Sequence, residues 1–390
     1  MGLKALELRR RHRNMQDLLA AHAEWLQSGQ YTITPNIAWE RSTRVPPEIS
    51  GKLNRMTENA TVLDTVKRRI RRPFLAGLTY AQLSNGSGRA TIIKRGNKRG
   101  SNTDVILIAP AHGTVTRLAT TPVFTPEYRR TRLAIGRYLP TPTFELCADG
   151  HGITEQYIAG DSLRITQDTQ KGQYAVESLL EDLRAACGSL QRPAPQDARK
   201  DFEQYLEESA LVHHPAIARC QHDRLVDFLA APQVPAHNDL APGNILLTSS
   251  GPVVIDLAAS ELGYMPFWRD ATNLLLRWDS PGFWKGRYDN HLQSLFDLAD
   301  QPQPDPAESR YELAIANSLM SDPLMCFSEH SYIPNRTRSK TPTDRFAKQW
   351  ARLGCVVDSQ PNPVCPYPAH RFGIFRHAKA LLGGKDQRGA

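Results

Sequence analysis

The chain has 390 residues, 40% of them hydrophobic and 23% charged, which is typical of a globular protein with a large core and two or three domains. No run of about 18 apolar residues occurs and no apolar segment follows the first basic residues, so we expect neither a membrane-spanning helix nor a secretory signal. The six cysteines are far apart and form no C-x-x-C pair, which favours free thiols in a reducing cytoplasm over a disulfide framework or a zinc site.

Positive charge is concentrated at the start of the chain. Residues 1–100 contain 19 Lys and Arg against 7 Asp and Glu, a net charge of +12, so the remaining residues sum to −4 within the total of +8. The basic residues cluster at Arg9–Arg13, Lys67–Arg72 and Lys94–Arg99. Such clusters bind anionic lipid, nucleic acid or phosphorylated glycans, or they are solvated surface without a partner. Both interpretations stay open.

The first 75 residues are expected to form a basic helical extension. Apolar residues at helical spacing predict an amphipathic helix over 3–28, whose arginines suit an anionic surface. Prolines predict a loop over 29–50, and a second helical stretch is expected from about 51 to 70.

From residue 76 onward the pattern changes to short β-branched strands, and after Gly160 it becomes mainly helical. Strands are expected at 78–83 and 90–94 around a Gly-rich turn, at 104–109 and 113–119, and as a hairpin at 144–147 and 153–158. Pro126 marks the start of a helix between them. Later helices are predicted near 175–190, 197–214, 215–231, 268–279, 287–299, 307–320 and 374–382. The predicted class is therefore α+β, with a small β-rich lobe before a larger α-helical lobe.

The run His237–Leu247, followed by Val253–Asp256, contains the residues from which chemistry is inferred. Asp239 precedes Asn244 by five residues, and Asp256 lies twelve residues further on. Phosphoryl transfer needs a carboxylate near the attacking hydroxyl, and an amide and a carboxylate that bind Mg²⁺. We therefore predict Asp239 as the catalytic residue and Asn244 and Asp256 as metal ligands. His237 is expected to brace the loop by hydrogen bonds.

The two apolar runs around these residues are expected to pair. Ile245–Leu247 and Val253–Asp256 predict a hairpin with its turn at Ser249-Ser250-Gly251. Such a hairpin would hold Asn244 and Asp256 on one side of the same metal ion. Chance alone should produce the His-x-Asp-x-x-x-x-Asn spacing on the order of once in fifty chains of this length. The second apolar strand ending in an Asp makes coincidence much rarer.

The segment His237–Leu247 with Ile255-Asp256 resembles the catalytic-loop motif of the aminoglycoside phosphotransferase and choline kinase superfamily. Gly263, Pro266 and the segment from Asp270 resemble its continuation, in which the Asp is largely structural. The resemblance implies a bilobal protein-kinase-like fold that uses ATP and Mg²⁺ to phosphorylate small-molecule hydroxyls. It also implies an N-lobe over 76–160 and a C-lobe over 161–390. The segment Tyr157–Leu163 resembles the hinge whose backbone contacts adenine, and Gln156, Tyr157 and Ile158 are the residues expected to bind the nucleotide there.

The chain departs from the family pattern in three places. Asn238 stands where Gly is frequent, and no small-lobe lysine is evident. The family register places Arg117 in the role of that lysine with Glu127 as its partner, while Lys94 is the competing candidate. Ser84, Asn85 and Gly86 resemble the nucleotide-covering loop, although a Gly- and Ser-rich hairpin turn is an equal interpretation. If both assignments fail, the chain would either bind nucleotide weakly or be a degenerate kinase.

The acceptor and the cellular site are the least defined. Residues 261–330 contain 11 acids and 5 bases, which is compatible with a cationic acceptor, whereas the basic first hundred residues favour a lipid-linked or polyanionic one. We expect a cytoplasmic enzyme, with peripheral contact to an anionic membrane or polyanion through residues 1–100 as an open option. The rival functions are a pseudokinase or scaffold, and a nucleic-acid-binding protein that uses the basic segment.

Overall fold

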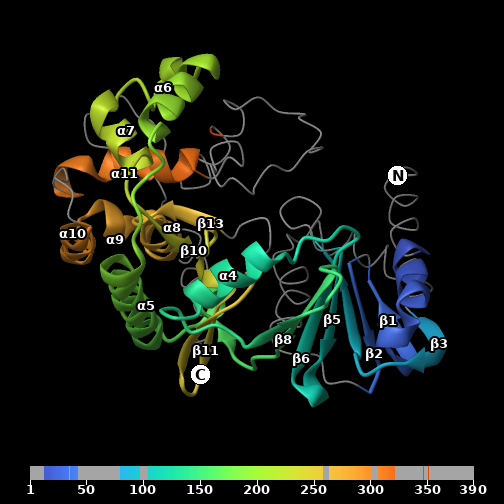
Figure 1. Cartoon of the computed structure of the whole chain (residues 1–390). Helices are drawn as coiled ribbons and strands as arrows, with labels where there is room; N and C mark the ends of the chain where they lie inside the picture. The colour runs from blue at the N-terminus through green and yellow to red at the C-terminus, as the bar shows by residue number, and fades with distance from the viewer. Residues whose placement is uncertain are drawn as a thin grey trace, which may run out of the picture.

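The computed structural model describes residues 13–34, 36–42, 80–96, 104–257, 263–299 and 306–320, together with Phe346 and Trp350. Strands dominate the first part of this chain and helices the second, and the two parts lie side by side (Figure 1). The α+β class, with a β-rich lobe followed by an α-helical lobe, is therefore confirmed. The basic runs at Arg9–Arg13 and Lys67–Arg72 fall largely or wholly outside the described residues.

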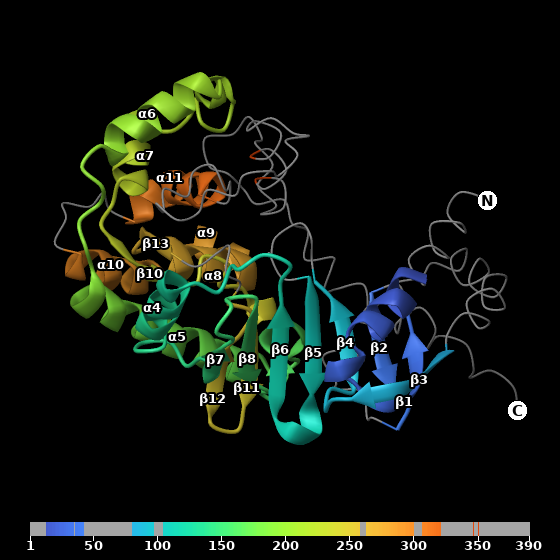
Figure 2. The same cartoon turned by 45° about the vertical axis from the view of Figure 1, so that its right-hand side comes forward.

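An antiparallel sheet forms the N-terminal part. Its eight strands run in the order β3-β1-β2-β4-β5-β6-β8-β7, and Figure 2 shows them side by side. One face is covered by the helical residues 13–21, whose Met15 and Leu19 join a core with Leu26 and Tyr31. The strands are β1 (Gln27–Ile33), β2 (Ile37–Glu40), β3 (Tyr80–Ser87), β4 (Ile92–Arg95), β5 (Val105–Ala109), β6 (Thr114–Leu118), β7 (Phe144–Leu146) and β8 (Gly152–Gln156).

The prediction of a helix to residue 28 and a loop from residue 29 is wrong. The helical residues end at 21, a 3₁₀ turn follows at Ala23–Trp25, and β1 and β2 enter the sheet. Tyr31 and Ile33 alternate with more exposed neighbours and are completely buried, which is the burial pattern of a half-buried strand. The prolines of this segment predict a loop, whereas the alternation of buried and more exposed residues is that of a strand. Residues 27–40 are thus part of the sheet rather than of a helical extension.

The predicted nucleotide-covering turn is also wrong. Ser84, Asn85 and Gly86 lie inside β3, which pairs with β1, and β1 and β2 separate β3 from β4. A Cβ at Gly86 would lie 2.6 Å from the Leu26 carbonyl oxygen, so the glycine permits close backbone packing. At about 4.8 Å per strand, β3 lies roughly 24 Å across the sheet from β6.

Helices form the C-terminal part around one core. The predicted helices between 175 and 320 are confirmed, although η4 (Leu211–His213) and its flanking turns interrupt the stretch before α7. The proposed final helix near 374–382 lies outside the described residues. The helices are α5 (Thr169–Leu190), α6 (Ala198–Glu208), α7 (His222–Leu229), α8 (Arg269–Trp278), α9 (Ser280–Trp284), α10 (Asp289–Leu298) and α11 (Pro306–Leu319).

Short strands frame the segment on which the motif lies. Strand β10 (Gln233–Ala236) pairs with β13 (Gly263–Pro266), and β11 (Ile245–Thr248) pairs with β12 (Gly251–Val254) and β9 (Asp161–Ser162). The β11–β12 hairpin confirms the predicted pairing, with Ile245 opposite Val254. The motif residues 237–244 therefore form the connection between two anchored strands.

Helix α4 (Pro126–Ile135) lies at the junction of the two parts (Figure 1). Its predicted start is confirmed: Pro126 is the first helical residue, and the Thr125 hydroxyl caps the helix by accepting the Tyr128 N–H at 3.2 Å. Ile135 and Leu139 belong to the C-terminal core, and the Val254 N–H donates to Pro140 O at 2.7 Å. The chain between α4 and β7 thus ties the sheet to the helical part.

Two expectations from composition can be checked in the described part of the chain. Cys147, Cys187 and Cys220 are free thiols there. No helix among the described residues has both the length and the apolar character needed to cross a membrane.

Candidate active site

The loop between β10 and β11 brings the motif residues together. Backbone pairing continues past the β11–β12 hairpin, because the Ile255 N–H donates to Asn244 O at 2.8 Å. Asn244 therefore lies opposite Ile255, and Asp256 is the next residue along that segment. The pairing thus brings the backbones of the two metal-ligand candidates to the same end of the hairpin.

His237 braces the loop from its buried interior, as the sequence predicted. Its Nδ1 accepts the Asp239 N–H at 3.3 Å, so Nε2 carries the ring proton and donates to Ile255 O at 3.0 Å. The side chain is completely buried. His237 thereby ties the Asp239 backbone to the segment that leads to Asp256.

Asp239 is held between a cation and an amide. Its Oδ1 accepts from Arg277 Nη1 at 3.0 Å, and its Oδ2 accepts from Asn244 Nδ2 at 3.3 Å. About a third of the Asp239 side chain, 36%, remains exposed. Asn244 Nδ2 also donates to the Asp239 carbonyl at 3.0 Å, which leaves the Asn244 amide oxygen for another partner.

One face of helix α8 supports this loop over its whole length. Asp270 accepts the N–H groups of His237 at 2.7 Å and Asn238 at 2.8 Å, and Asn273 Nδ2 donates to Leu240 O at 2.9 Å. Together with Arg277, these residues follow the i, i+3, i+7 spacing of one helix face. The structural role that the family resemblance implied for Asp270 is confirmed, and Asn273 and Arg277 extend it.

Two site residues adopt left-handed backbone conformations. Asn238 has a φ of 65° and Asp256 a φ of 66°. Asn and Asp tolerate this region better than other residues with a Cβ, which explains how Asn238 can replace the glycine that is frequent in the family. The Asn238 side chain also accepts from Arg269 Nε at 3.2 Å.

Arg117 reaches the motif from the sheet. Its Nη1 donates to Asp256 Oδ1 at 2.8 Å and its Nε to Glu155 Oε2 at 2.6 Å. Lys94 pairs with Ile106, and Ile106 pairs with Arg117, so the two basic side chains share one face of the sheet. The structure thus brings both candidate phosphate-binding cations to the same side.

The predicted partner of Arg117 is wrong. The carboxylate that pairs with Arg117 is Glu155 on β8, whereas Glu127 at the start of α4 pairs with Arg130 at 2.7 Å. Arg132 of α4 completes the network with Nη2 at 2.5 Å from Glu155 Oε1. The helix therefore supplies a cation, and the strand supplies the carboxylate.

Charge controls the pKa values in this network. Desolvation raises the pKa of Glu155, but the guanidinium groups of Arg117 and Arg132 lower it further, so the net pKa lies below its ordinary value of 4.5. The pKa of Asp256 is likewise raised by desolvation and lowered more strongly by Arg117, Lys94 and His237, with a net decrease. Both carboxylates are ionised at neutral pH.

The predicted hinge follows β8 directly. The N–H groups of Gln156 and Tyr157 donate to Thr143 O at 2.9 Å and Gly113 O at 2.8 Å. The Ile158 N–H has no hydrogen-bond acceptor within the described part of the chain. Of the three predicted hinge residues, Ile158 is therefore the one with a backbone donor open to a ligand.

Sequence reasoning missed three residues of this site. Arg132 follows Tyr128 by four residues and precedes Ile135 by three, so helical spacing already placed it on the buried face of α4. Arg277 follows Asp270 by seven residues, which is again one helix face. For Glu155 the sequence offered only an acidic residue in a short strand, because its partners come from distant elements.

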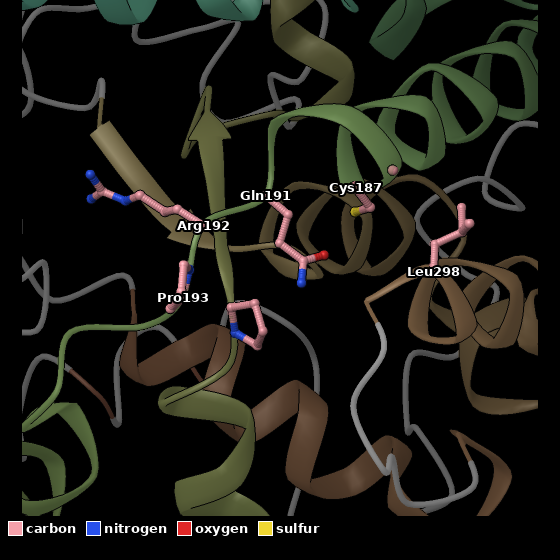
Figure 3. Close-up of a pocket in the computed structure, with 7 residues that line it drawn as sticks. Cys187, Gln191, Arg192, Pro193 and Leu298 are labelled. Atoms are coloured by element: carbon pink, nitrogen blue, oxygen red, sulfur yellow. The ribbon is translucent and has the colours of Figure 1, made fainter.

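A shallow cavity of about 340 Å³ lies at the end of α5 (Figure 3). None of its lining residues belongs to the motif or to the charged network. Burial raises the pKa of Cys187 to about 12, so its thiol is not a ready nucleophile. The lining consists of Cys187, Gly188, Gln191, Arg192, Pro193, Pro232 and Leu298.

A family comparison finds a match to the part of the chain that contains this loop. Residues 167–306, just over a third of the chain, match the model of the phosphotransferase enzyme family. The matched segment contains Asp239, Asn244, Asp256 and the supporting helix α8. The resemblance inferred from the sequence is therefore confirmed for this segment. No curated protein sequence matches the chain.

Solved structures give a more distant likeness. A macrolide 2′-phosphotransferase type I has 16% identity and a TM-score of 0.42, with 76% of this chain and 99% of that one covered. A choline/ethanolamine kinase family protein from Mesorhizobium loti has 15% identity and a TM-score of 0.38, with 76% and 95% covered. An aminoglycoside phosphotransferase from Streptomyces rimosus has 14% identity and a TM-score of 0.35, with 55% and 89% covered.

Proposed function

We propose that the protein is a phosphotransferase that uses ATP and Mg²⁺ to phosphorylate a hydroxyl of a small molecule or glycan. The observation that carries this proposal is the joining of Asp239, Asn244 and Asp256 by one hydrogen-bonded loop, with Arg117 at Asp256. Phosphoryl transfer depends mainly on positioning and electrostatic stabilisation, and these residues supply both. We place the reaction in the cytoplasm, where ATP is available.

Asp239 orients the acceptor. Its partly exposed carboxylate accepts a hydrogen bond from the hydroxyl and takes its proton as the oxygen–phosphorus bond forms. The bond from the γ-phosphorus to the bridging oxygen breaks, and ADP leaves. Arg277 and Asn244 hold the carboxylate in one orientation throughout.

Asn244 and Asp256 have the donor atoms that Mg²⁺ prefers. The Asn244 amide nitrogen faces Asp239, which leaves its oxygen for the ion, and Asp256 adds a charged oxygen. Within the described residues, no cluster of three or more His, Cys, Asp or Glu side chains could hold a metal alone. Phosphate and water oxygens would complete the shell. The bound ion would neutralise the charge that develops on the phosphates.

The sheet would hold the nucleotide. We assign Arg117 to the phosphate oxygens, since it already binds the metal-ligand candidate Asp256 and is fixed by Glu155. Lys94 lies in the same row of the sheet and offers a second cation. The Ile158 N–H is the assigned contact to adenine.

Turnover measurements test this function. Wild type should release ADP from ATP in the presence of Mg²⁺ and a hydroxyl acceptor, and Asp239→Asn should reduce the rate by about 10²- to 10⁴-fold. The variant should keep the wild-type circular dichroism spectrum and Mg²⁺-dependent ATP binding. Unchanged turnover in Asp239→Asn, or wild type that binds no ATP, would contradict the proposal and favour a scaffold.

A further inference from the structure

The electrostatics beside Asp239 identify the class of acceptor. We propose that the hydroxyl compound phosphorylated by this protein also carries an anionic group, such as a phosphate or carboxylate, and that Arg277 binds that group. This inference rests on the proposed phosphotransferase function and specifies its substrate.

Arg277 has the geometry for such a contact. It lies in the last turn of α8, with 33% of its side chain exposed, and contacts Asp239 through Nη1 alone. Its remaining N–H groups have no partner within the described part of the chain. A guanidinium is a planar fork whose donors match two oxygens of a carboxylate or phosphate. One nitrogen can therefore hold Asp239 while the others bind an anion.

A second cation borders the same loop. A Cβ on Gly243 would lie 3.9 Å from Arg164 Cδ, and Arg164 is exposed. Gly243 directly precedes the metal-ligand candidate Asn244. The loop that carries Asp239 and Asn244 is thus flanked by two arginines, and both would attract an anionic acceptor.

Of the acids that seemed compatible with a cationic acceptor, those that the structure describes are engaged in other contacts. Asp270 accepts hydrogen bonds from backbone N–H groups of the loop. The other carboxylates that the structure describes between residues 263 and 320 contact groups outside the loop. None of these contacts involves Asp239. The pairs are Asp279 with Arg287, Asp289 with Arg310, Asp297 with Gln293, Glu308 with Arg224 and Glu312 with the Gln221 N–H.

Among the described residues, the charged side chain that contacts the Asp239 carboxylate is Arg277, so a cation lies next to the group that would orient the hydroxyl. An ammonium group in the acceptor would approach Arg277 against like-charge repulsion, whereas a phosphate or carboxylate would form charge-assisted hydrogen bonds. With its anion on Arg277 and its hydroxyl on Asp239, the acceptor is fixed at two points. The expectation of a cationic acceptor is not supported by this geometry.

Ligand-dependent thermal stabilisation tests the inference. The protein is first saturated with Mg²⁺ and the non-hydrolysable analogue AMP-PNP, which fills the γ-phosphate position. Inorganic sulfate and glycerol 3-phosphate are then titrated, with glycerol and ethanolamine as neutral and cationic comparisons. We expect both anions to raise the unfolding midpoint and neither comparison compound to do so.

Variants assign the effect to Arg277. Arg277→Gln should weaken the apparent affinity for both anions by about 10- to 100-fold, the loss of one or two charge-assisted hydrogen bonds, while AMP-PNP still raises the midpoint. Arg277→Lys should lie in between. The control is Arg224→Gln, because Arg224 is similarly exposed at 29% and also pairs with one carboxylate; it should match wild type.

The two proposals fail in different ways. Absence of any AMP-PNP effect would refute the phosphotransferase function and with it this inference. A normal AMP-PNP effect with no response to anions, an equal anion response in Arg277→Gln, or stronger binding of ethanolamine than of glycerol 3-phosphate would refute the anionic acceptor alone.

Discussion

The two halves of the candidate site are built in different ways. The catalytic loop consists of residues close together in the sequence, and the three loop-supporting side chains of α8 follow one helix face. The phosphate-side network joins Arg117, Arg132 and Glu155 from β6, α4 and β8. The first half rests mainly on backbone hydrogen bonds, and the second on buried charge.

This difference determines what each half tolerates. Loss of Glu155 from the buried network leaves Arg132 without its counter-charge, which is among the most destabilising changes in a protein. Losing one support of the loop weakens hydrogen bonds that its neighbours partly retain. We therefore expect stability to respond most to the network and activity to respond most to the loop.

Glu155→Gln should have the largest effect on stability. Arg132 then loses its carboxylate partner and Arg117 keeps only Asp256, so the free energy of unfolding should fall by about 3–5 kcal/mol. The matched control is Glu127→Gln, which removes only the surface pair with Arg130 and should cost less than about 1 kcal/mol. Urea unfolding of the three proteins measures both. Equal losses in the free energy of unfolding would contradict Glu155, rather than Glu127, as the partner of Arg117.

Asp270→Asn should have the next largest effect. An amide offers one acceptor oxygen for the two N–H groups of His237 and Asn238, so we expect a loss of about 1–3 kcal/mol together with reduced turnover. Asp297→Asn, at an exposed position of α10, serves as the control. A variant that matched this control in stability and turnover would show that α8 does not position the loop.

The left-handed conformation at Asn238 predicts a smaller difference. Asn238→Gly and Asn238→Ala both remove the amide, but only alanine must adopt a φ of 65° with a Cβ. The alanine variant should be less stable than the glycine variant by about 1–2 kcal/mol. Thermal unfolding of the two side by side measures the gap, and no gap would mean that the loop relaxes to negative φ.

The lowered pKa of Glu155 predicts a pH dependence. A carboxylate whose pKa falls on folding stabilises the protein above its ordinary pKa of 4.5, and this contribution disappears as pH falls through the folded value. Wild type should therefore lose its advantage over Glu155→Gln as pH drops below about 4.5. Unfolding curves from pH 7 to pH 3 test this, and a constant difference would argue against the lowered pKa.

The same contrast explains what could be predicted from the sequence. Asp239, Asn244, His237 and the β11–β12 hairpin are specified by local spacing and by alternation, which the sequence displays directly. Strand order is not a local property of the sequence. Because β1 and β2 lie between β3 and β4, Ser84–Gly86 on β3 are far from Arg117 on β6. The partner of Arg117 was missed for the same reason, since β8 is brought next to β6 only by folding.

The most direct test of the central claim is calorimetric titration of ATP, with and without Mg²⁺, into wild type and Asp256→Asn. We predict that Mg²⁺ strengthens ATP binding to wild type by at least about tenfold and that the variant loses most of this gain, because Asp256 supplies the charged metal ligand. An equal Mg²⁺ effect in both proteins, or no ATP binding to wild type, would contradict the account.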